Sequence, residues 1–133
     1  MNKNNYSKIS YSKTTTYNTN GNYGIIATNT RNDQKSYLRY WFDDVSELIG
    51  KTISYSADVK TTKSLILFIY QYDGSKYTFD LVHIPENSEN KYTLTTIVKD
   101  TTTALWIGPE FQTAQQEGET FYTDNWELKL ISS

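Results

Sequence analysis

The sequence predicts an all-β domain, folded as a sandwich or a barrel. Short runs rich in Tyr, Thr, Ile and Val recur along the chain, and polar loops such as PENSEN and QTAQQEGE separate them. The dipeptides Asn20-Gly21 and Asp73-Gly74 are typical of tight turns between antiparallel strands. Aromatic residues make up 15% of the chain, and the 12 tyrosines among them favour half-buried sheets. Many short strands with turn signals between them are typical of both architectures.

The expected strands are runs in which apolar side chains alternate or cluster between turn signals. The clearest pair is SLILFIYQY and SKYTFDLVHI, because Asp73-Gly74 lies between these runs as in a tight hairpin. The full set of expected strands is 23–30, 36–42, 52–60, 64–72, 75–84, 91–99, 103–109 and 121–131.

One segment departs from the strand pattern and predicts a short helix near residues 44–49. After Phe42, the sequence DDVSELIG places Asp44 three residues before Glu47, which is close to a capping box. Gly50 follows at the position where helices often end with glycine. We expect one or two helical turns here.

Length and composition indicate one domain without disulfides. A chain of 133 residues can bury enough apolar surface to fold as one unit. We assign residues 21–133 to this domain and expect the polar residues 1–20 to be partly mobile. The chain has no cysteine, which excludes disulfides, thiolate nucleophiles and cysteine-based zinc sites.

The charge distribution argues against nucleic-acid binding. Thirteen basic and fifteen acidic residues give a net charge of -2, and the basic residues form no block. No apolar span is long enough to cross a bilayer, so we expect no membrane insertion, and the N-terminus lacks the apolar core of a signal peptide. We therefore expect either a protein made in the cytoplasm, which includes a virion-associated protein, or an extracellular module of a larger secreted polypeptide.

Because successive side chains of a strand point to opposite faces, each run predicts a core face and a second face. In SLILFIYQY, TALWIGP and SYLRYWF the second face is also apolar, and it presents Tyr70, Trp106 and Trp41. A strand such as SLILFIYQY is central, and something other than water covers its second face at least in part. The alternative for each ring is that it completes the core, which is what we expect for Trp126. The predicted core faces are Ile53, Tyr55, Ala57 and Val59; Leu65, Leu67 and Ile69; Leu105 and Ile107; and Leu38, Tyr40 and Phe42.

Residues 48–131 contain a series of short motifs. The first is LIGKTISYSADVKTT and the last is GETFYTDNWELKL, and YDGS, KYTLT and LWIGPEF lie between them. Together these motifs resemble the jelly-roll carbohydrate-binding modules of polysaccharide hydrolases and of bacteriophage tail and baseplate proteins. The first motif is similar to an early strand of these modules, and the last is similar to their final strand. The resemblance implies a jelly-roll β-sandwich of two antiparallel sheets, one of them concave and lined by aromatic and hydrogen-bonding side chains for an oligosaccharide.

The implied function is non-catalytic capture of a cell-wall or plant polysaccharide. The C–H face of a pyranose stacks on an aromatic ring, and its hydroxyls need polar partners such as Arg, Asp and Glu. On this reading the stacking platforms are Trp106, Trp41 and Tyr70, and the polar groups are Arg39, Asp58 and Glu110. The alternative for Asp58 is a strand residue that is exposed to solvent and binds nothing.

The resemblance also implies a structural calcium ion held by Asp124. This residue lies in YTDNW, where the family frequently has an aspartate that binds calcium through hard oxygen ligands. Thr123 stands where the family prefers an aliphatic residue, which weakens the match. The alternative for Asp124 is a plain aspartate at the end of a strand.

The residues do not predict catalysis. Glycosidases commonly use two carboxylates at a defined separation, and no paired-carboxylate motif marks Asp58, Asp80 or Glu110. His83, the single histidine, is better explained as an inward or boundary side chain than as a general base. We therefore expect a binding module rather than an enzyme. The alternative function is a structural or host-receptor-binding domain of a phage-like tail or baseplate protein, within a larger polypeptide or virion.

Overall fold

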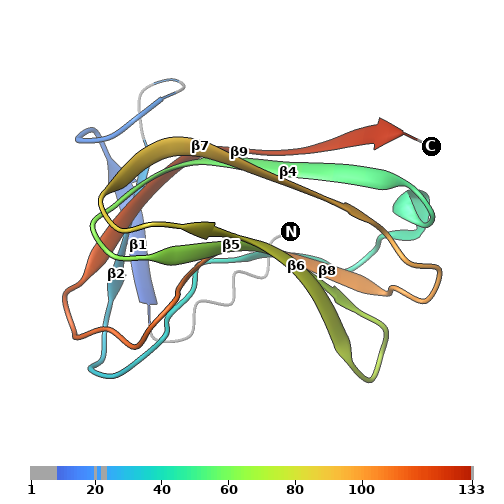
Figure 1. The fold of residues 1–133 in the computed structure, drawn as a ribbon, viewed down its shortest axis with the longest axis horizontal. Helices are drawn as coiled ribbons and strands as arrows, with labels where there is room; N and C mark the ends of the chain where they lie inside the picture. The colour runs from blue at the N-terminus through green and yellow to red at the C-terminus, as the bar shows by residue number, and fades with distance from the viewer. Residues whose placement is uncertain (1–8, 20, 22–23, 133) are drawn as a thin grey trace.

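The chain folds as two antiparallel sheets packed face to face, shown in Figure 1. The computed structural model describes residues 9–19, 21 and 24–132. The only helical element among these residues is one short turn, and none of their helices has the length and apolar character needed to span a membrane. The all-β sandwich predicted from the sequence is therefore confirmed.

The order of the strands is that of a jelly roll, because the chain crosses from one sheet to the other at nearly every connection. Only two consecutive pairs, β1–β2 and β5–β6, stay within one sheet. The five-stranded sheet has the order β1 (Ile9–Thr14), β2 (Gly24–Asn29), β9 (Thr120–Ser132), β4 (Thr52–Thr61) and β7 (Ser88–Ile97). The four-stranded sheet has the order β3 (Tyr40–Phe42), β8 (Ala104–Phe111), β5 (Leu65–Tyr72) and β6 (Tyr77–Ile84).

The predicted hairpin and the predicted helical turn are both present. Tyr72 pairs with Tyr77 across the hairpin. The Asp73 carboxylate closes its turn by accepting hydrogen bonds from the amides of Ser75 and Lys76, each at 2.9 Å. The helical element is a single 3-10 turn, η1 (Ser46–Leu48). No capping box with Glu47 forms; instead Asp44 accepts a hydrogen bond from the Ser46 amide at 3.1 Å.

The N-terminal segment contains a strand that the sequence does not predict. β1 pairs with β2 along its whole length, although only Ile9 among its six residues is buried. Because its other side chains are polar or exposed, the run ISYSKT carries no clear apolar pattern. The mobility expected for residues 1–8 and Asn20 falls outside the described residues.

The expected strand 36–42 is shorter than predicted. Only β3 pairs continuously with β8, and Tyr37 forms an isolated bridge with Glu110. Between them the amide of Leu38 donates a hydrogen bond to the carbonyl of Pro109 at 3.0 Å. The two backbones approach very closely here, because a Cβ atom added to Gly108 would lie 2.0 Å from the Leu38 carbonyl oxygen. Only glycine therefore fits at position 108 without a shift of the chain.

The core lies between the two sheets and contains the predicted side chains. Tyr55, Ala57 and Val59 on β4 are fully buried, as are Leu65, Leu67 and Ile69 on β5. Leu105 and Ile107 of β8 join the same cluster, and Tyr40 and Phe42 of β3 pack against it. The period-two alternation therefore predicts the inward faces of these strands correctly.

A β-bulge in β9 changes which residues of that strand face the core. Asn125 has a φ of 53°, a conformation that asparagine adopts more readily than most residues, and the pairing with β4 shifts register beside it. Phe121 and Thr123 face inward before the bulge, and Trp126 packs inward after it. The Trp126 indole contacts the Tyr55 ring at 5.8 Å and donates a hydrogen bond to Thr123 Oγ1 at 2.7 Å. The expectation that Trp126 belongs to the core is confirmed.

Candidate ligand-binding face

The outer surface of the four-stranded sheet carries a row of aromatic side chains in register. Trp41 on β3 lies opposite Trp106 on β8, Trp106 lies opposite Tyr70 on β5, and Tyr70 lies opposite Phe79 on β6. The row therefore crosses all four strands at right angles to their direction. We call this surface the aromatic face and define it by these rings together with Tyr37, Arg39, Phe68, Tyr72, Tyr77 and Glu110.

The rings of the aromatic face pack against one another. Trp106 contacts Trp41 at 5.2 Å between ring centroids, Tyr77 at 5.0 Å and Tyr72 at 5.9 Å. These neighbours leave Trp106 only 5% exposed, whereas Tyr77 and Phe79 on the edge strand are 53% and 58% exposed. Trp41 and Tyr70 are partly buried. The accessible rings are thus those around Trp106, and Trp106 lies beneath them.

Arg39 fills the space beside the row and presents a cation on this face. Its guanidinium lies 4.2 Å from the centroid of the Tyr37 ring and 5.0 Å from that of Trp106, and its Nη2 donates a hydrogen bond to the Tyr37 hydroxyl at 3.2 Å. Such stacking fixes the orientation of the side chain. In the described part of the chain, the buried donors Arg39 Nε and Trp106 Nε1 on this face have no hydrogen-bond acceptor. Most buried polar atoms in folded proteins have a hydrogen-bond partner, so these two donors are exceptions.

Glu110 brings an acidic group to the same face. It bridges to Tyr37 and lies opposite Ile66 of β5. Burial raises the pKa of its carboxyl above the ordinary value, and the positive charges of Arg39 and Lys35 oppose that shift. Burial also raises the pKa of the Tyr70 phenol, with a further contribution from the negative charge of Glu110. Glu110, Arg39 and Tyr70 therefore share one partly desolvated environment.

The structure brings together five of the six side chains that the sequence analysis names as ligand-binding. Trp106, Trp41, Tyr70, Arg39 and Glu110 all lie on the aromatic face. Five more side chains of this face were not predicted to bind a ligand, although their alternation within the runs SYLRYWF, SLILFIYQY and SKYTFDLVHI would have indicated them. They are Tyr37, Phe68, Tyr72, Tyr77 and Phe79. His83 is exposed on the edge strand β6, at the boundary of the sheet rather than inward.

The sixth predicted residue, Asp58, lies on the other sheet. Its neighbours across the strands are Lys91 of β7 and Asp124 of β9. Its carboxylate accepts a hydrogen bond from the Thr19 hydroxyl, so the connection between β1 and β2 covers it in part. Asp58 is therefore separated from the aromatic face by the thickness of the sandwich.

Asp124, the predicted calcium ligand, has both carboxylate oxygens engaged by backbone amides. One accepts from Thr19 at 2.7 Å and the other from Asn125 at 2.8 Å. In the described part of the chain, no group of three or more Asp, Glu, His or Cys side chains could hold a metal ion. Calcium usually has six to eight oxygen ligands, and backbone carbonyls can supply several of them. Calcium binding at Asp124 stays a prediction.

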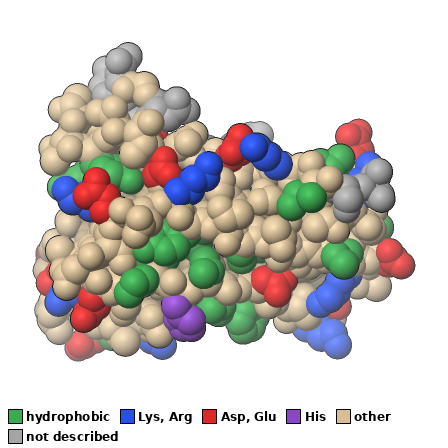
Figure 2. Space-filling view, turned by 45° about the horizontal axis from the view of Figure 1, so that its top comes forward, with side chains coloured by type: hydrophobic (Ala, Val, Ile, Leu, Met, Phe, Trp, Pro, Cys, Tyr) green, Lys and Arg blue, Asp and Glu red, His purple; other side chains and the backbone are tan. Residues whose placement is uncertain are grey.

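The outer face of the five-stranded sheet has a different chemistry. Glu89 lies opposite Lys60, Lys91 lies opposite Asp58, and Ser and Thr occupy the next outward positions of β4 and β7. Figure 2, in which the top of Figure 1 comes forward, shows charged side chains of both signs spread over the upper part of the molecule. The exposed rings of the four-stranded sheet have no counterpart among the described outward residues of β4 and β7.

The ends of the aromatic face are flanked by loops. The β5–β6 turn projects from the sandwich at one end of the four-stranded sheet, and the connections near residues 31–35 and 112–119 project at the other end (Figure 1). A bridge between Gln34 and Gln115 joins these two connections. The loops therefore border the aromatic row on both sides.

Comparison with known proteins identifies the fold. No protein-family model matches the chain, and no curated protein matches its sequence. The CBM22-1 xylan-binding domain of Paenibacillus barcinonensis Xyn10C superposes with a TM-score of 0.72 and 10% identity, over 99% of this chain and 86% of that domain. The C-terminal family 22 carbohydrate-binding module of Clostridium thermocellum Xyn10B superposes with a TM-score of 0.70 and 11% identity, over 92% of this chain and 80% of that one.

A bacteriophage protein has a domain of the same shape. The enzymatically active domain of tailspike protein 4 from bacteriophage CBA120 superposes with a TM-score of 0.63 and 15% identity over 94% of this chain. This chain spans only 20% of the length of that tailspike chain. At these identities the likeness is one of fold. The chain thus has the jelly-roll β-sandwich fold found in carbohydrate-binding modules and in a phage tailspike protein.

Proposed function

We propose that this chain is a non-catalytic carbohydrate-binding module that captures a cell-wall or plant polysaccharide on its aromatic face. The observation that carries the proposal is the row Trp41–Trp106–Tyr70–Phe79, which runs in register across the whole four-stranded sheet. An extended glycan has alternating apolar ring faces and hydroxyl edges, and a line of rings bordered by polar groups matches both. The fold shared with xylan-binding domains supports this proposal.

The polar groups of the aromatic face complement a sugar in the same way. Arg39 and Glu110 supply a charged donor and a charged acceptor, and the phenols of Tyr37 and Tyr70 can act as either. Charge-assisted hydrogen bonds to hydroxyls are stronger than neutral ones, so these two residues would fix the orientation of a sugar stacked on the rings. Binding by one module would be weak and would gain strength through repetition, either along a larger secreted polypeptide or around a virion.

The second candidate function is a structural or host-receptor-binding domain of a phage-like tail. The match to a tailspike protein over 94% of this chain favours it. In that case the exposed rings of Tyr77 and Phe79 would be covered by a neighbouring chain rather than by a glycan. Sedimentation of the wild type and of Phe79→Ala would test this alternative, because loss of rings that hold an assembly together would release monomers.

The carbohydrate proposal is tested by binding of the full chain to soluble xylan, β-glucan and bacterial cell-wall glycans. Trp41→Ala and Phe79→Ala each remove an accessible ring, and we expect each variant to bind the retained glycan about three- to tenfold more weakly. Tyr11→Ala is the matched control, since Tyr11 is 42% exposed on the other sheet. Trp106→Ala is a poorer probe because Trp106 is buried and its loss also removes packing.

Two results would contradict the proposal. The first is a wild-type chain that retains none of these glycans. The second is a Trp41→Ala variant that binds as tightly as the wild type while its melting temperature is unchanged. A loss of binding by Tyr11→Ala alone would place the site on the opposite sheet.

A further inference from the structure

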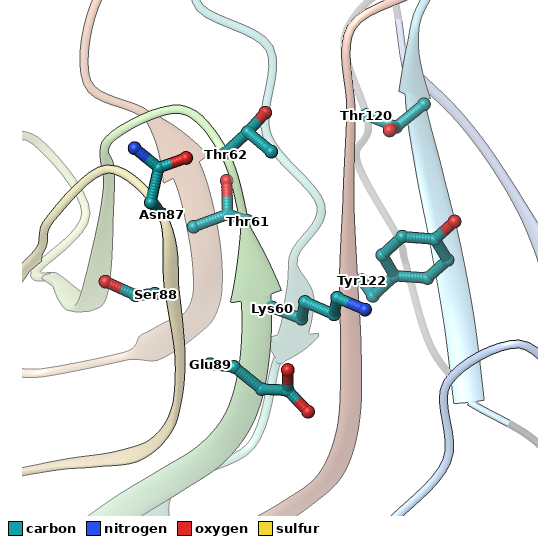
Figure 3. A pocket seen from close by; sticks show the side chains of 8 residues that line it. All are labelled: Lys60, Thr61, Thr62, Asn87, Ser88, Glu89, Thr120 and Tyr122. Carbon is teal, nitrogen blue, oxygen red and sulfur yellow. The ribbon is translucent and has the colours of Figure 1, made fainter.

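A second pocket lies on the outer face of the five-stranded sheet, at the end where β4 and β7 meet their loops. It has a volume of about 270 Å³, close to the lower limit for pockets that hold small ligands. Its walls come from three strands, as Figure 3 shows. The side chains that line it include Lys60, Thr62, Asn87, Glu89, Thr120 and Tyr122.

The floor of this pocket is held in place by short hydrogen bonds. Thr61 and Ser88 lie opposite each other on β4 and β7. The Thr61 hydroxyl donates to the Lys63 carbonyl and the Ser88 hydroxyl donates to the Pro85 carbonyl, each at 2.6 Å. Both connecting loops are thereby tied to the strands that they join. The pocket is thus formed in advance of any ligand, which lowers the entropic cost of binding.

The described polar side chains around the pocket form no hydrogen bonds or ion pairs with one another. Lys60 and Glu89 are neighbours across β4 and β7, yet no ion pair joins them within the described residues. Instead the Lys60 ammonium reaches toward the Tyr122 ring, 5.9 Å from its centroid (Figure 3). The described residues likewise offer no hydrogen-bond partner to the side chains of Thr62, Asn87 and Glu89. Donors and acceptors therefore surround the pocket without satisfying one another.

Tyr122 supplies a ring with a fixed position. The Tyr17 ring, which is buried, contacts it at 5.9 Å between centroids. Gly24 allows the Tyr17 backbone to approach closely, because a Cβ at position 24 would lie 2.1 Å from the Tyr17 carbonyl oxygen. The Tyr122 ring is thus braced from the side of the β1–β2 connection, and its opposite side borders the pocket.

We infer that this pocket is a second saccharide-binding site, which takes one or two residues of a neutral sugar independently of the aromatic face. One ammonium and one carboxylate balance in charge, so neither an anion nor a cation is favoured. Sugar hydroxyls both donate and accept hydrogen bonds, so they match the amide, hydroxyl, ammonium and carboxylate groups that line the pocket. The Tyr122 ring offers an apolar surface for the sugar ring. The two sites lie on opposite sheets, so one chain could bridge two glycan strands.

The test is a titration of the isotope-labelled full chain with cellotriose, xylotriose and tri-N-acetylchitotriose, followed by amide chemical shifts. We expect saturable shifts at Thr62, Asn87 and Tyr122 with at least one trisaccharide at concentrations up to about 10 mM. This concentration is ten times the dissociation constant of a site with a binding free energy of about 4 kcal/mol. Lys60→Met and Glu89→Gln should each weaken this binding about tenfold, because each removes one charged hydrogen bond. Lys129→Met is the matched control, since Lys129 is exposed on the same sheet outside the pocket.

The outcomes separate this inference from the proposed function. Trp41→Ala should leave the shifts at Asn87 and Tyr122 intact, and loss of those shifts would overturn the independence of the two sites. Saturable shifts confined to the aromatic face would remove the second site and keep the first. No saturable shift at the pocket residues with any of the three sugars, or equal binding by wild type, Lys60→Met and Glu89→Gln, would also overturn the inference.

Discussion

The two outer faces of the sandwich have the same strand geometry but differ in the side chains at their outward positions. On the four-stranded sheet the outward positions carry aromatic rings that contact one another, and two of them, Phe68 and Trp106, are as buried as core residues. On the five-stranded sheet the outward positions of β4 and β7 carry mainly hydroxyls and charges of both signs. One face is thus a second apolar layer, and the other is a solvated surface.

Burial on an outer face of the sandwich comes from side chains that reach across neighbouring strands. Tyr77 starts on the edge strand β6, and its ring lies 5.0 Å from Trp106, which is two strands away on β8. Long rings can cover such distances, whereas the Ser and Thr side chains on β4 and β7 cannot. The aromatic face therefore builds part of its own cover, and a ligand would meet the outermost rings first.

The largest effect that we expect from a single substitution is on the aromatic side of the sandwich, at Gly108. Its φ is 155° and an added Cβ would lie 2.0 Å from the Leu38 carbonyl oxygen and 2.9 Å from the Arg39 Cα atom. Backbone strain and overpacking together should make Gly108→Ala less stable by about 4 kcal/mol in the free energy of unfolding, measured with urea. Pairing of β3 with β8 should weaken as well.

Gly118→Ala is the matched control for this substitution. Gly118 has a φ of 97° but no atom within 4 Å of an added Cβ, so only the backbone strain remains. We expect a loss of about 1 kcal/mol for this variant. Equal losses for the two variants would show that the close approach of β3 to β8 contributes nothing to stability.

We expect a smaller loss of stability when one of two buried outward positions, one on each face, is changed to alanine. Phe68 on the aromatic face is 1% exposed, and Ser56 on the opposite face is 6% exposed. Phe68→Ala should lower the free energy of unfolding by about 3 kcal/mol, because the ring of a second apolar layer is lost. Ser56→Ala should lower it by less than about 1 kcal/mol. If both variants unfold at the same urea concentration, the aromatic face does not pack as a second layer.

Most of the fold could be predicted from the sequence because alternation and turn dipeptides are local signals. The inward faces of β4, β5 and β8 follow from period two, and the β5–β6 hairpin follows from Asp73-Gly74. β1 could not be predicted, since a polar edge strand leaves no apolar pattern. The bulge at Asn125 is also invisible in the sequence, because its φ of 53° depends on the pairing of β9 with β4.

For the candidate site, alternation could predict which face of its strand each residue occupies, but not which strands are neighbours. Trp41, Tyr70 and Trp106 each stand outward on their own strand, but the row that they form depends on the register between strands. Asp58 also points outward from its own strand. It lies on the opposite sheet from the aromatic row because β4 pairs with β7 and β9. Alternation gives a face for each strand, and topology decides which faces coincide.

The smallest effect that we expect concerns the charge of Glu110 on the aromatic face. Burial raises the pKa of its carboxyl in the folded state, so its contribution to stability is fully present below the pKa of the unfolded chain and is lost as pH rises through the folded pKa. Glu110→Gln should therefore gain stability relative to the wild type between pH 4 and pH 7, by a small amount because solvent reaches the group in part.

Urea unfolding of both chains across this pH range measures the effect, and Asp73→Asn provides a control of opposite sign. Hydrogen bonds from the Lys76 and Ser75 amides lower the pKa of Asp73, so its contribution is present above the unfolded pKa and is lost as pH falls. The Asn variant should therefore lose stability relative to the wild type as pH rises. If Glu110→Gln follows the same direction as Asp73→Asn, then the positive charges of Arg39 and Lys35 outweigh burial at position 110.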